Sequence, residues 1–171
     1  MMKRIQSAIV VFLLVFLCTA CASETIMITP ETYLAEINAL AENDFGTLTA
    51  ATNKENSSEA VAAISDRLFL SMTADPVTGF LSNAALTLRL DADIEALDYS
   101  SFTYFFLIML KAYDKDITIN NINSIYHALG IEEMVADTVS AIDYGSSHYT
   151  YAVTAENVVF SAEFRVRTQN T

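Results

Sequence analysis

The chain has 171 residues, a mean hydropathy of +0.34 and a formal net charge of −12 at neutral pH. An excess of 21 acidic over nine basic side chains argues against nucleic-acid binding, which depends on Lys and Arg neutralising phosphates. Both cysteines lie within the first 21 residues, so disulfides, cysteine-ligated zinc and thiol catalysis are not expected in the rest of the chain. The length after residue 22 suits one domain.

The first 22 residues have the three-part layout of a secretory signal peptide. Lys3 and Arg4 form a short positive region, residues 8–17 are an unbroken apolar run, and small side chains follow it. A membrane-spanning helix needs about 20 apolar residues, and this run ends too early to be one. Export is therefore predicted, and removal of residues 1–22 leaves seven basic residues against 21 acidic ones, a net charge near −14.

Two processing enzymes compete for the end of this signal peptide. Thr19-Ala20-Cys21 offers the small residues and the cysteine of lipoprotein processing, which would attach a lipid to Cys21. The A-x-A rule is equally satisfied for a cleavage between Ala22 and Ser23, which would release a free protein. Cys18 stands where lipoprotein signals usually carry leucine. Because the rest of the chain has no cysteine with which Cys21 could form a structural bridge, lipidation is the favoured interpretation.

Residues 23–29 are interpreted as a short tether, after which a helix and a group of strands are predicted. Thr29-Pro30-Glu31 supplies a cap, a first-turn proline and a first-turn acid, and predicts a helix over 30–43. A tight connection is predicted at 75–79, which contains proline and glycine. The strands expected in this part of the chain are 47–52, 61–64, 68–74 and 80–90, the last two forming a hairpin.

The most apolar part of the chain after residue 22 is predicted to be a buried helix. It begins with Ser100 and Ser101 as the cap, is apolar nearly all round, and ends at the polar link Asp114-Lys115-Asp116. A further helix is predicted between Thr118, as its cap, and Gly130, in the C-terminal cap position. The buried face expected for it consists of Ile119, Ile122, Ile125, Tyr126 and Leu129.

The last part of the chain alternates apolar and polar side chains and predicts a three-stranded meander. Its expected strands are 138–144, 148–154 and 158–166. Tyr149 and Tyr151 fall on the face that should point inward. Short loops imply antiparallel strands, and helices grouped between strands belong on one face of a sheet. The predicted fold is an α+β two-layer sandwich, an antiparallel sheet with three helices on one face in the order α-β-β-β-β-α-α-β-β-β, as a single domain over 30–168.

The spacing of the acidic residues does not indicate a metal site. Asp114-x-Asp116-x-Thr118-x-Asn120 has the oxygen spacing that opens a calcium loop, but Ile119 and Ile125 stand where that loop needs Gly and Glu. We therefore interpret the segment as a polar link between two helices. The acidic run over 91–98 is interpreted as a solvated loop whose carboxylates favour the start of the helix that follows. No metal and no cofactor are expected.

His127 and His148 are the only histidines, too few for a zinc site without cysteine. A Ser-His-Asp triad can be written from Ser146 or Ser147, His148 and Asp143. The sequence has no G-x-S-x-G elbow, however, and neighbours in a hairpin turn seldom converge on one point. No catalytic residue is therefore assigned and the chain is not expected to be an enzyme; a hydrolytic or metal-dependent enzyme is kept as an alternative.

A resemblance is carried by four stretches, which read T-P-E-T-Y-L-A-E-I-N, S-M-T-A-D-P-V-T-G-F-L, A-Y-D-K-D-I-T followed by A-L-G-I, and H-Y-T-Y-A-V followed by V-V-F-S-A-E-F. Together they resemble a loose group of uncharacterised small secreted and lipid-anchored proteins of Gram-positive bacteria, for which no activity is known. The order of helices and strands is also similar to that of the β-lactamase-inhibitor-protein architecture. This second likeness rests on order alone, and a fold does not imply a function.

The hypothesis from the sequence is an exported, lipid-anchored binding or interaction module on the outer face of the membrane. It would contact the membrane only through a lipid on Cys21, and its ligand would be an unidentified protein or small molecule. The alternative is a freely secreted, extracellular binding or inhibitor-like protein. Because tyrosine is enriched at interfaces, Tyr144 in the meander, together with His148, is taken as the candidate interaction surface.

Overall fold

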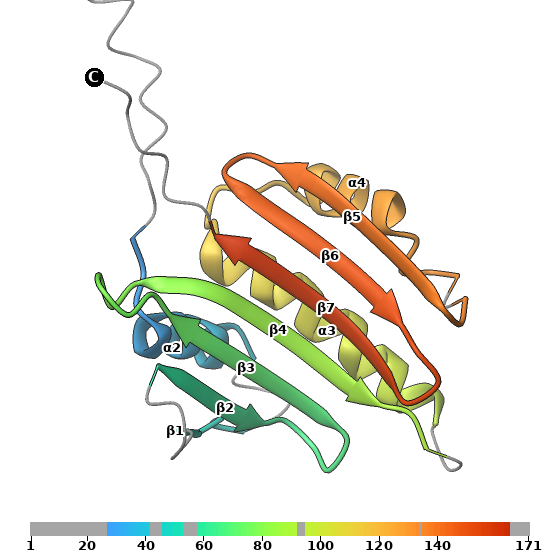
Figure 1. Ribbon diagram of the computed structural model, residues 1–171, viewed down its shortest axis with the longest axis horizontal. Helices are drawn as coiled ribbons and strands as arrows, with labels where there is room; N and C mark the ends of the chain where they lie inside the picture. The colour runs from blue at the N-terminus through green and yellow to red at the C-terminus, as the bar shows by residue number, and fades with distance from the viewer. Residues whose placement is uncertain (1–26, 42–45, 53–57, 92–94, 134, 165–171) are drawn as a thin grey trace, which may run out of the picture.

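A computed structural model of the chain describes residues 27–41, 46–52, 58–91, 95–133 and 135–164. The described residues form three helices and a seven-stranded antiparallel sheet, which confirms the predicted α+β class and element order (Figure 1). In chain order the elements are α2 (Pro30–Ala41), β1 (Ala50–Thr52), β2 (Glu59–Ala63), β3 (Leu68–Ala74), β4 (Leu81–Arg89), α3 (Ala96–Tyr113), α4 (Ile119–Leu129), β5 (Thr138–Tyr144), β6 (Ser147–Val153) and β7 (Asn157–Phe164).

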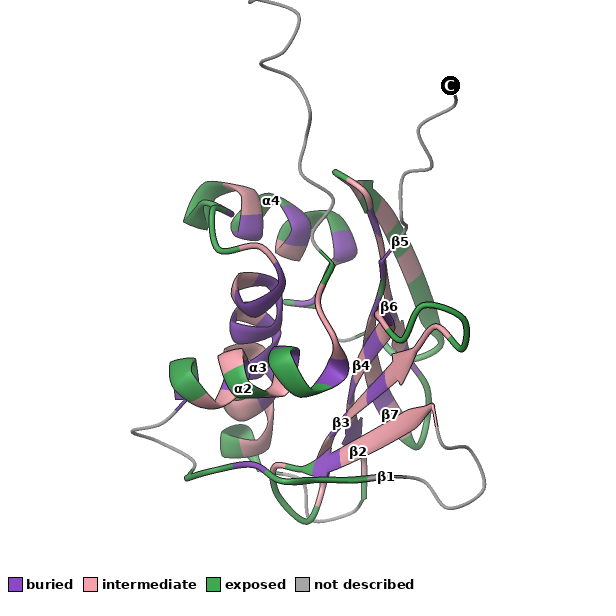
Figure 2. Cartoon of the chain, turned by 90° about the vertical axis from the view of Figure 1, so that its left-hand side faces the viewer, coloured by how far each residue is buried: buried purple, intermediate pink, exposed green. Residues whose placement is uncertain are grey.

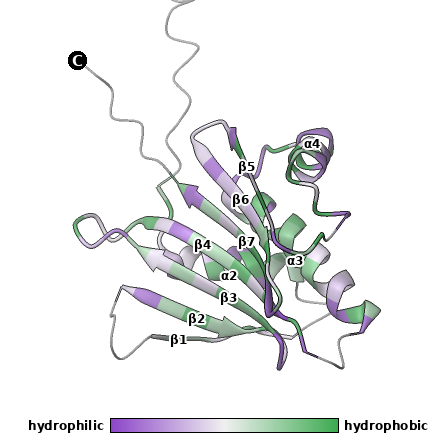
Figure 3. Cartoon of the chain, turned by 45° about the vertical axis from the view of Figure 1, so that its right-hand side comes forward, coloured by the Kyte–Doolittle hydropathy of each residue, from purple (hydrophilic) through white to green (hydrophobic). Residues whose placement is uncertain are grey.

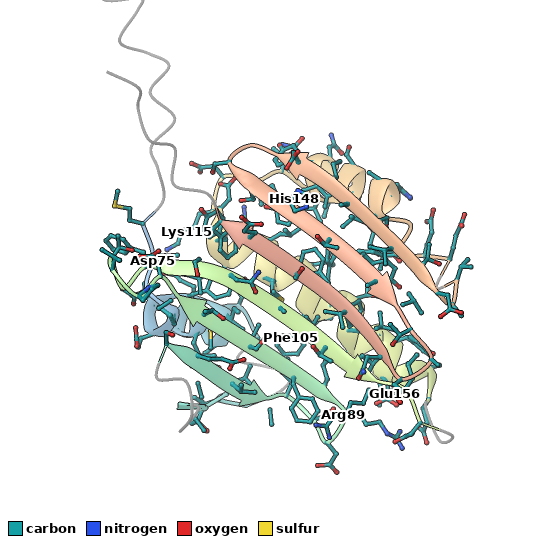
Figure 4. The ribbon with its side chains drawn as sticks, viewed as in Figure 1. Asp75, Arg89, Phe105, Lys115, His148 and Glu156 are labelled. Carbon is teal, nitrogen blue, oxygen red and sulfur yellow. The ribbon has the colours of Figure 1, made fainter. Side chains whose placement is uncertain are left out.

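The strand order β1-β2-β3-β4-β7-β6-β5 joins two groups of sequential hairpins. Within each group every strand pairs with its neighbour in sequence, as short loops require. The groups meet in the middle of the sheet, where β4 pairs with β7 and Leu86 lies opposite Phe160. Figure 4 shows Asp75 and Lys115 at one end of the sheet and Arg89 and Glu156 at the other.

All three helices lie on the same face of the sheet (Figure 2), and the core lies between these two layers. Alternate side chains of the central strands point into it, as the period of two predicts. Helix α3 supplies the opposite side, with Phe106 and Phe160 in an edge-to-face contact at a centroid distance of 4.7 Å. Tyr149 and Tyr151 are 3% and 2% exposed, which confirms their predicted inward face. Figure 3 shows hydrophobic residues along much of α3, in green.

Helix α2 is attached by buried polar and aromatic contacts. The hydroxyl of Tyr33, a fully buried residue, donates to the carbonyl of Met109 in α3 at 3.0 Å, and its ring meets that of Phe164 edge-on. Asn38 bonds both the N–H and the C=O of Leu48, at 2.7 and 2.9 Å. One side-chain amide thereby satisfies both backbone groups of a segment that belongs to no strand.

The start of α3 differs from the prediction. The helix begins at Ala96, and its cap is Glu95, which forms a capping box with Asp98. The hydroxyl of Ser100 donates instead to the carbonyl of Ala96 within the first turns. The prediction of a Ser100-Ser101 cap was wrong because it followed the apolar run, whereas the capping box begins the helix before that run.

The caps of α4 are as predicted. The Thr118 hydroxyl accepts from the N–H of Asn121 at 3.3 Å, and Gly130 ends the helix with φ of 66°. Ile131 is fully buried after it. The prediction for Ile119 was wrong, because this first residue of the helix is 61% exposed. Directly after the cap, its side chain lies beyond the edge of the core and borders a groove described below.

Candidate functional site

The most distinctive surface of the described chain is a groove along the side of α3 that points away from the sheet. Its first part has a volume of about 580 Å³ and lies between α3, α4 and the turn after α4. Tyrosine rings dominate its walls. The lining residues are Tyr99, Ser100, Thr103, Tyr104, Leu107, Tyr126, Ile131 and Glu132.

A second groove continues the first toward the C-terminal end of α3. It has a volume of about 390 Å³, and it shares Tyr104 and Leu107 with the first part. The two grooves form one surface, which we call the α3 trough. The residues of its second part are Leu40, Tyr104, Leu107, Ile108, Lys111, Ile117, Ile119 and Ile122.

The local sequence explains why α3 has an apolar outer side. Phe102, Phe105 and Phe106 are fully buried on the inner side of the helix. Tyr104 and Leu107 are partly exposed and fall at helical spacing on the other side. The helix is therefore apolar nearly all round, as the sequence indicates, yet only its inner side is fully covered.

The α3 trough contains few charged groups, and each has a contact. Lys111 Nζ donates to the carbonyls of Lys115 and Ile117, the latter at 3.1 Å. Glu132 Oε1 lies 3.1 Å from His127 Nδ1. Since Lys111 closes the turn between α3 and α4, its ammonium group holds this wall of the trough in place.

A polar atom with no partner within the described chain lies beneath the trough. The hydroxyl of Tyr151 is buried and makes no hydrogen bond there. Its ring contacts Phe102 on the inner side of α3, at a centroid distance of 6.4 Å. Burial, together with the smaller effect of Tyr126 and Tyr99, which line the trough, raises the pKa of Tyr151 to about 12. Three phenol groups are therefore close in this region, one below the surface and two at it.

On the opposite face of the sheet, which none of the three described helices covers, one predicted pair of residues does come together. His148 Nδ1 lies 2.8 Å from Asp143 Oδ1, between the neighbouring strands β5 and β6. Glu163 is opposite His148 on β7. This arrangement resembles the oriented imidazole of a catalytic triad, but on an exposed sheet surface.

The serines of the hypothetical triad lie elsewhere. Ser147 is 4% exposed on the helix-covered face, and hydrogen bonds from Ser146 and Ser147 partly offset the effect of burial on the pKa of Tyr113. Since alternate residues of a strand point to opposite faces, Ser147 and His148 are separated by the sheet. The structure therefore forms the His148–Asp143 pair without either predicted nucleophile.

The same alternation separates Tyr144 from His148. Tyr144 pairs with Ser147 and packs against the core on the helix-covered face, whereas His148 lies on the open face. The two residues taken from the sequence as the candidate interaction surface therefore lie on opposite faces of the sheet. The lipid attachment site Cys21 and the alternative cleavage site at Ala22 and Ser23 lie outside the described residues.

The two acidic segments have structural roles. Asp114 ends α3, and its carboxylate accepts from the N–H of Asp116 at 3.0 Å. At the other end of α3, Arg67 bridges Asp91 and Asp98, each at 3.1 Å. The backbone N–H of Glu95 and the guanidinium of Arg67 lower the pKa of Asp98. These contacts close one turn and fix one helix start.

The α3 trough was missed from the sequence because its apolar residues were all assigned to the core. One signal was present: Tyr99, Tyr104 and Tyr126 carry hydroxyls, which favour a half-exposed position over a core position. Among the residues that the structure describes, no helix has the length and apolarity needed to cross a bilayer.

The fold and the trough define the class of the protein as an α+β two-layer domain with an apolar, tyrosine-lined groove on its helical side. No family model, curated protein or solved structure matches the chain. The resemblance to small secreted and lipid-anchored proteins therefore stays a prediction from the sequence.

Proposed function

We propose that the chain is an exported interaction module of the cell envelope, held at the membrane by a lipid on Cys21, which binds a protein partner through the α3 trough. The observation that carries this proposal is the continuity of the trough, where two grooves of about 580 and 390 Å³ share Tyr104 and Leu107. An open groove of this volume, lined by apolar and aromatic side chains with a few polar groups, is typical of a binding site. Tyrosine is favoured there because its rigid ring is apolar and its tip is polar.

The charge of the chain indicates the chemistry of the partner. Each basic residue in the described ranges is engaged: Arg67 with two aspartates, Arg89 over the ring of Phe69, Lys111 with two carbonyls and Lys115 with Glu36. The excess acidic residues give the mature chain a charge near −14. A partner segment with apolar or aromatic side chains and basic flanking residues would complement both the trough and this field.

Site-specific photo-crosslinking in intact cells tests the docking surface. A photoreactive phenylalanine replaces Ile119, which is 61% exposed in the trough, and in a matched control it replaces Val77, which is 91% exposed outside it. The proposal expects one discrete adduct from position 119 and none from position 77. Leu40→Asp in the trough should abolish the adduct, and added salt should weaken it. Equal adducts from both positions would reflect general hydrophobic contact and would refute the docking surface.

The anchor is tested separately by mass spectrometry of the mature N-terminus. Lipid-modified Cys21 as the first residue is expected, and Cys21→Ala should move the chain from the membrane fraction to the medium. A peptide that begins at unmodified Ser23 would favour the freely secreted alternative. That result would leave the docking proposal intact, because the trough lies wholly within the folded domain.

A hydrolytic enzyme remains a second candidate function because of one observation, the 2.8 Å contact between His148 and Asp143. Without a serine beside it, the imidazole could act only as a general base toward water. Activity against ester substrates that disappears in both His148→Ala and Asp143→Asn would support this candidate. Unchanged or absent activity in both variants would leave the pair a surface contact.

A further inference from the structure

Strand β5 forms one edge of the sheet, and it is built differently from the other edge. It has seven residues and, among the described strands, pairs only with β6, whereas β1 at the opposite edge has three residues. Proteins usually protect a long edge strand with lysine, proline, a bulge or a covering segment. In β5 the register is continuous, no proline or basic residue is present, and Val139 is 72% exposed. Helix α4 contacts β5 on the helix-covered face, where the Ser140 hydroxyl donates to the carbonyl of Leu129. Within the described residues, the backbone edge of β5 itself therefore stays available for strand addition.

The β5–β6 turn shows which backbone groups face outward. Tyr144 and Ser147 close a two-residue loop, and in such a hairpin the closing residues form a hydrogen-bonded pair. The alternation that follows directs the N–H and C=O groups of Val139 and Ala141 away from β6. Within the described chain, no hydrogen bond joins the backbone of Val139 or Ala141 to another segment on that outer side. An added strand would meet these groups directly.

We propose that two copies of this chain associate through β5, paired antiparallel about a two-fold axis that lies midway between their Ala141 residues. This register aligns all seven residues, placing Thr138 opposite Tyr144, Val139 opposite Asp143 and Ser140 opposite Ile142. Paired residues then share a face, so both helix layers stay on one side of a continuous sheet. A small side chain lies at the axis, and no charged residue of β5 meets its like.

The occupant is a second copy because β5 complements itself in this register. An axis at Ser140 would place Asp143 opposite residue 137, which lies outside the strand. An axis at Ile142 would place Val139 opposite residue 145, which also lies outside it. Each shift therefore leaves part of β5 unpaired. The high negative charge of each copy opposes association, so screening by salt should strengthen it. This pairing is independent of the α3 trough, which lies on the helical side.

Disulfide trapping gives a direct test. The chain that begins at Ser23 contains no cysteine, so Ala141→Cys introduces a single thiol. Across a hydrogen-bonded antiparallel pair the two Cα atoms lie about 5.5 Å apart, within the range of a disulfide. The proposal expects rapid dimer formation under mild oxidation. Ala63→Cys, an exposed position on β2, is the matched control and should remain mostly monomeric.

Sedimentation equilibrium of lysine variants then tests the register. Ala141→Lys places two like charges at the axis and should weaken association about tenfold, whereas Val139→Lys creates two cross-strand pairs with Asp143 and should tighten it about fivefold. Ala63→Lys changes the net charge equally and controls for general repulsion. Circular dichroism checks that each variant is folded. A monomer at every concentration, or equal association of the three variants, would overturn the proposal.

Discussion

The buried hydroxyl of Tyr151 allows a prediction whose sign depends directly on the structure. Tyr33 and Tyr151 are both almost fully buried, but within the described residues only the Tyr33 hydroxyl has a hydrogen-bond partner, the carbonyl of Met109 at 3.0 Å. The same chemical change, Tyr to Phe, should therefore have opposite effects at the two positions. Tyr151→Phe removes a buried polar group that has no partner in the described chain, and Tyr33→Phe removes a satisfied one.

The magnitudes follow from the cost of burying a hydroxyl. A buried hydroxyl without a hydrogen bond costs about 1–3 kcal/mol, so Tyr151→Phe should raise the free energy of unfolding by about 1 kcal/mol or more. A satisfied hydrogen bond contributes about 1 kcal/mol net, so Tyr33→Phe should lower it by about that amount. The two variants should then differ by about 2 kcal/mol, or roughly 6 °C in melting temperature for a domain of this size.

Urea unfolding of the chain that begins at Ser23, followed by far-ultraviolet circular dichroism, measures both changes. The slope of the free energy against urea concentration should stay constant, because neither variant alters the buried surface substantially. The reasoning would be refuted if Tyr151→Phe were destabilising, because the hydroxyl would then have a stabilising partner. If Tyr151→Phe lowered the free energy of unfolding as much as Tyr33→Phe does, the Tyr151 hydroxyl would have to be hydrogen-bonded in the folded chain.

Three further predictions concern the ends of helices and the response to pH. Asp98→Asn should destabilise the chain at neutral pH. Because the pKa of Asp98 is lowered in the folded state, the difference in stability from the parent should vanish as pH falls through that lowered pKa. Urea unfolding midpoints from pH 7 downward measure this difference. Gly130→Ala should lower the free energy of unfolding by about 1 kcal/mol, because φ of 66° is unfavourable for alanine. The added Cβ would meet no atom within 4 Å, so steric overlap does not contribute. Gly130→Asn should cost less, and equal losses for both variants would contradict this cause. Burial raises the pKa of Tyr149 and Tyr151 to about 12. Their contribution to the free energy of unfolding should therefore be fully present below the ordinary tyrosine pKa of about 10 and decrease as pH rises toward 12. Ultraviolet titration should show these phenols ionising only as the domain unfolds.

Local signals in the sequence were sufficient to predict most of the elements. The Thr118 cap and the Gly130 termination of α4 were predicted correctly because one side chain and one backbone conformation determine each. The hairpin of β3 and β4 follows from the loop between them, where the Asp75 carboxylate accepts from the N–H groups of Val77 and Thr78. These features involve residues within four positions of one another, where sequence patterns are most informative.

The arrangement of these elements was not accessible in the same way. The pairing of β4 with β7 joins residues about 75 positions apart, and it is decided by the packing of both hairpin groups on α3 rather than by a turn. The α3 trough depends on this arrangement, because the partial exposure of Tyr104 and Leu107 results from where α2 and α4 lie. A sequence pattern shows that a helix is apolar all round, but it does not show which side remains uncovered.

The proposed anchor and the proposed dimer constrain each other. The carbonyl of Ile28 accepts from the N–H of Leu81, so the tether leaves the domain at the end of the sheet where β4 begins. A two-fold axis normal to the sheet places the tethers of the two copies at opposite ends, separated by at least the length of β4, about 30 Å for nine residues. The six Cα–Cα steps from Cys21 to Met27 reach at most about 22 Å. If both copies are lipidated in one membrane, the strands cannot stand upright on it and must be inclined toward its plane.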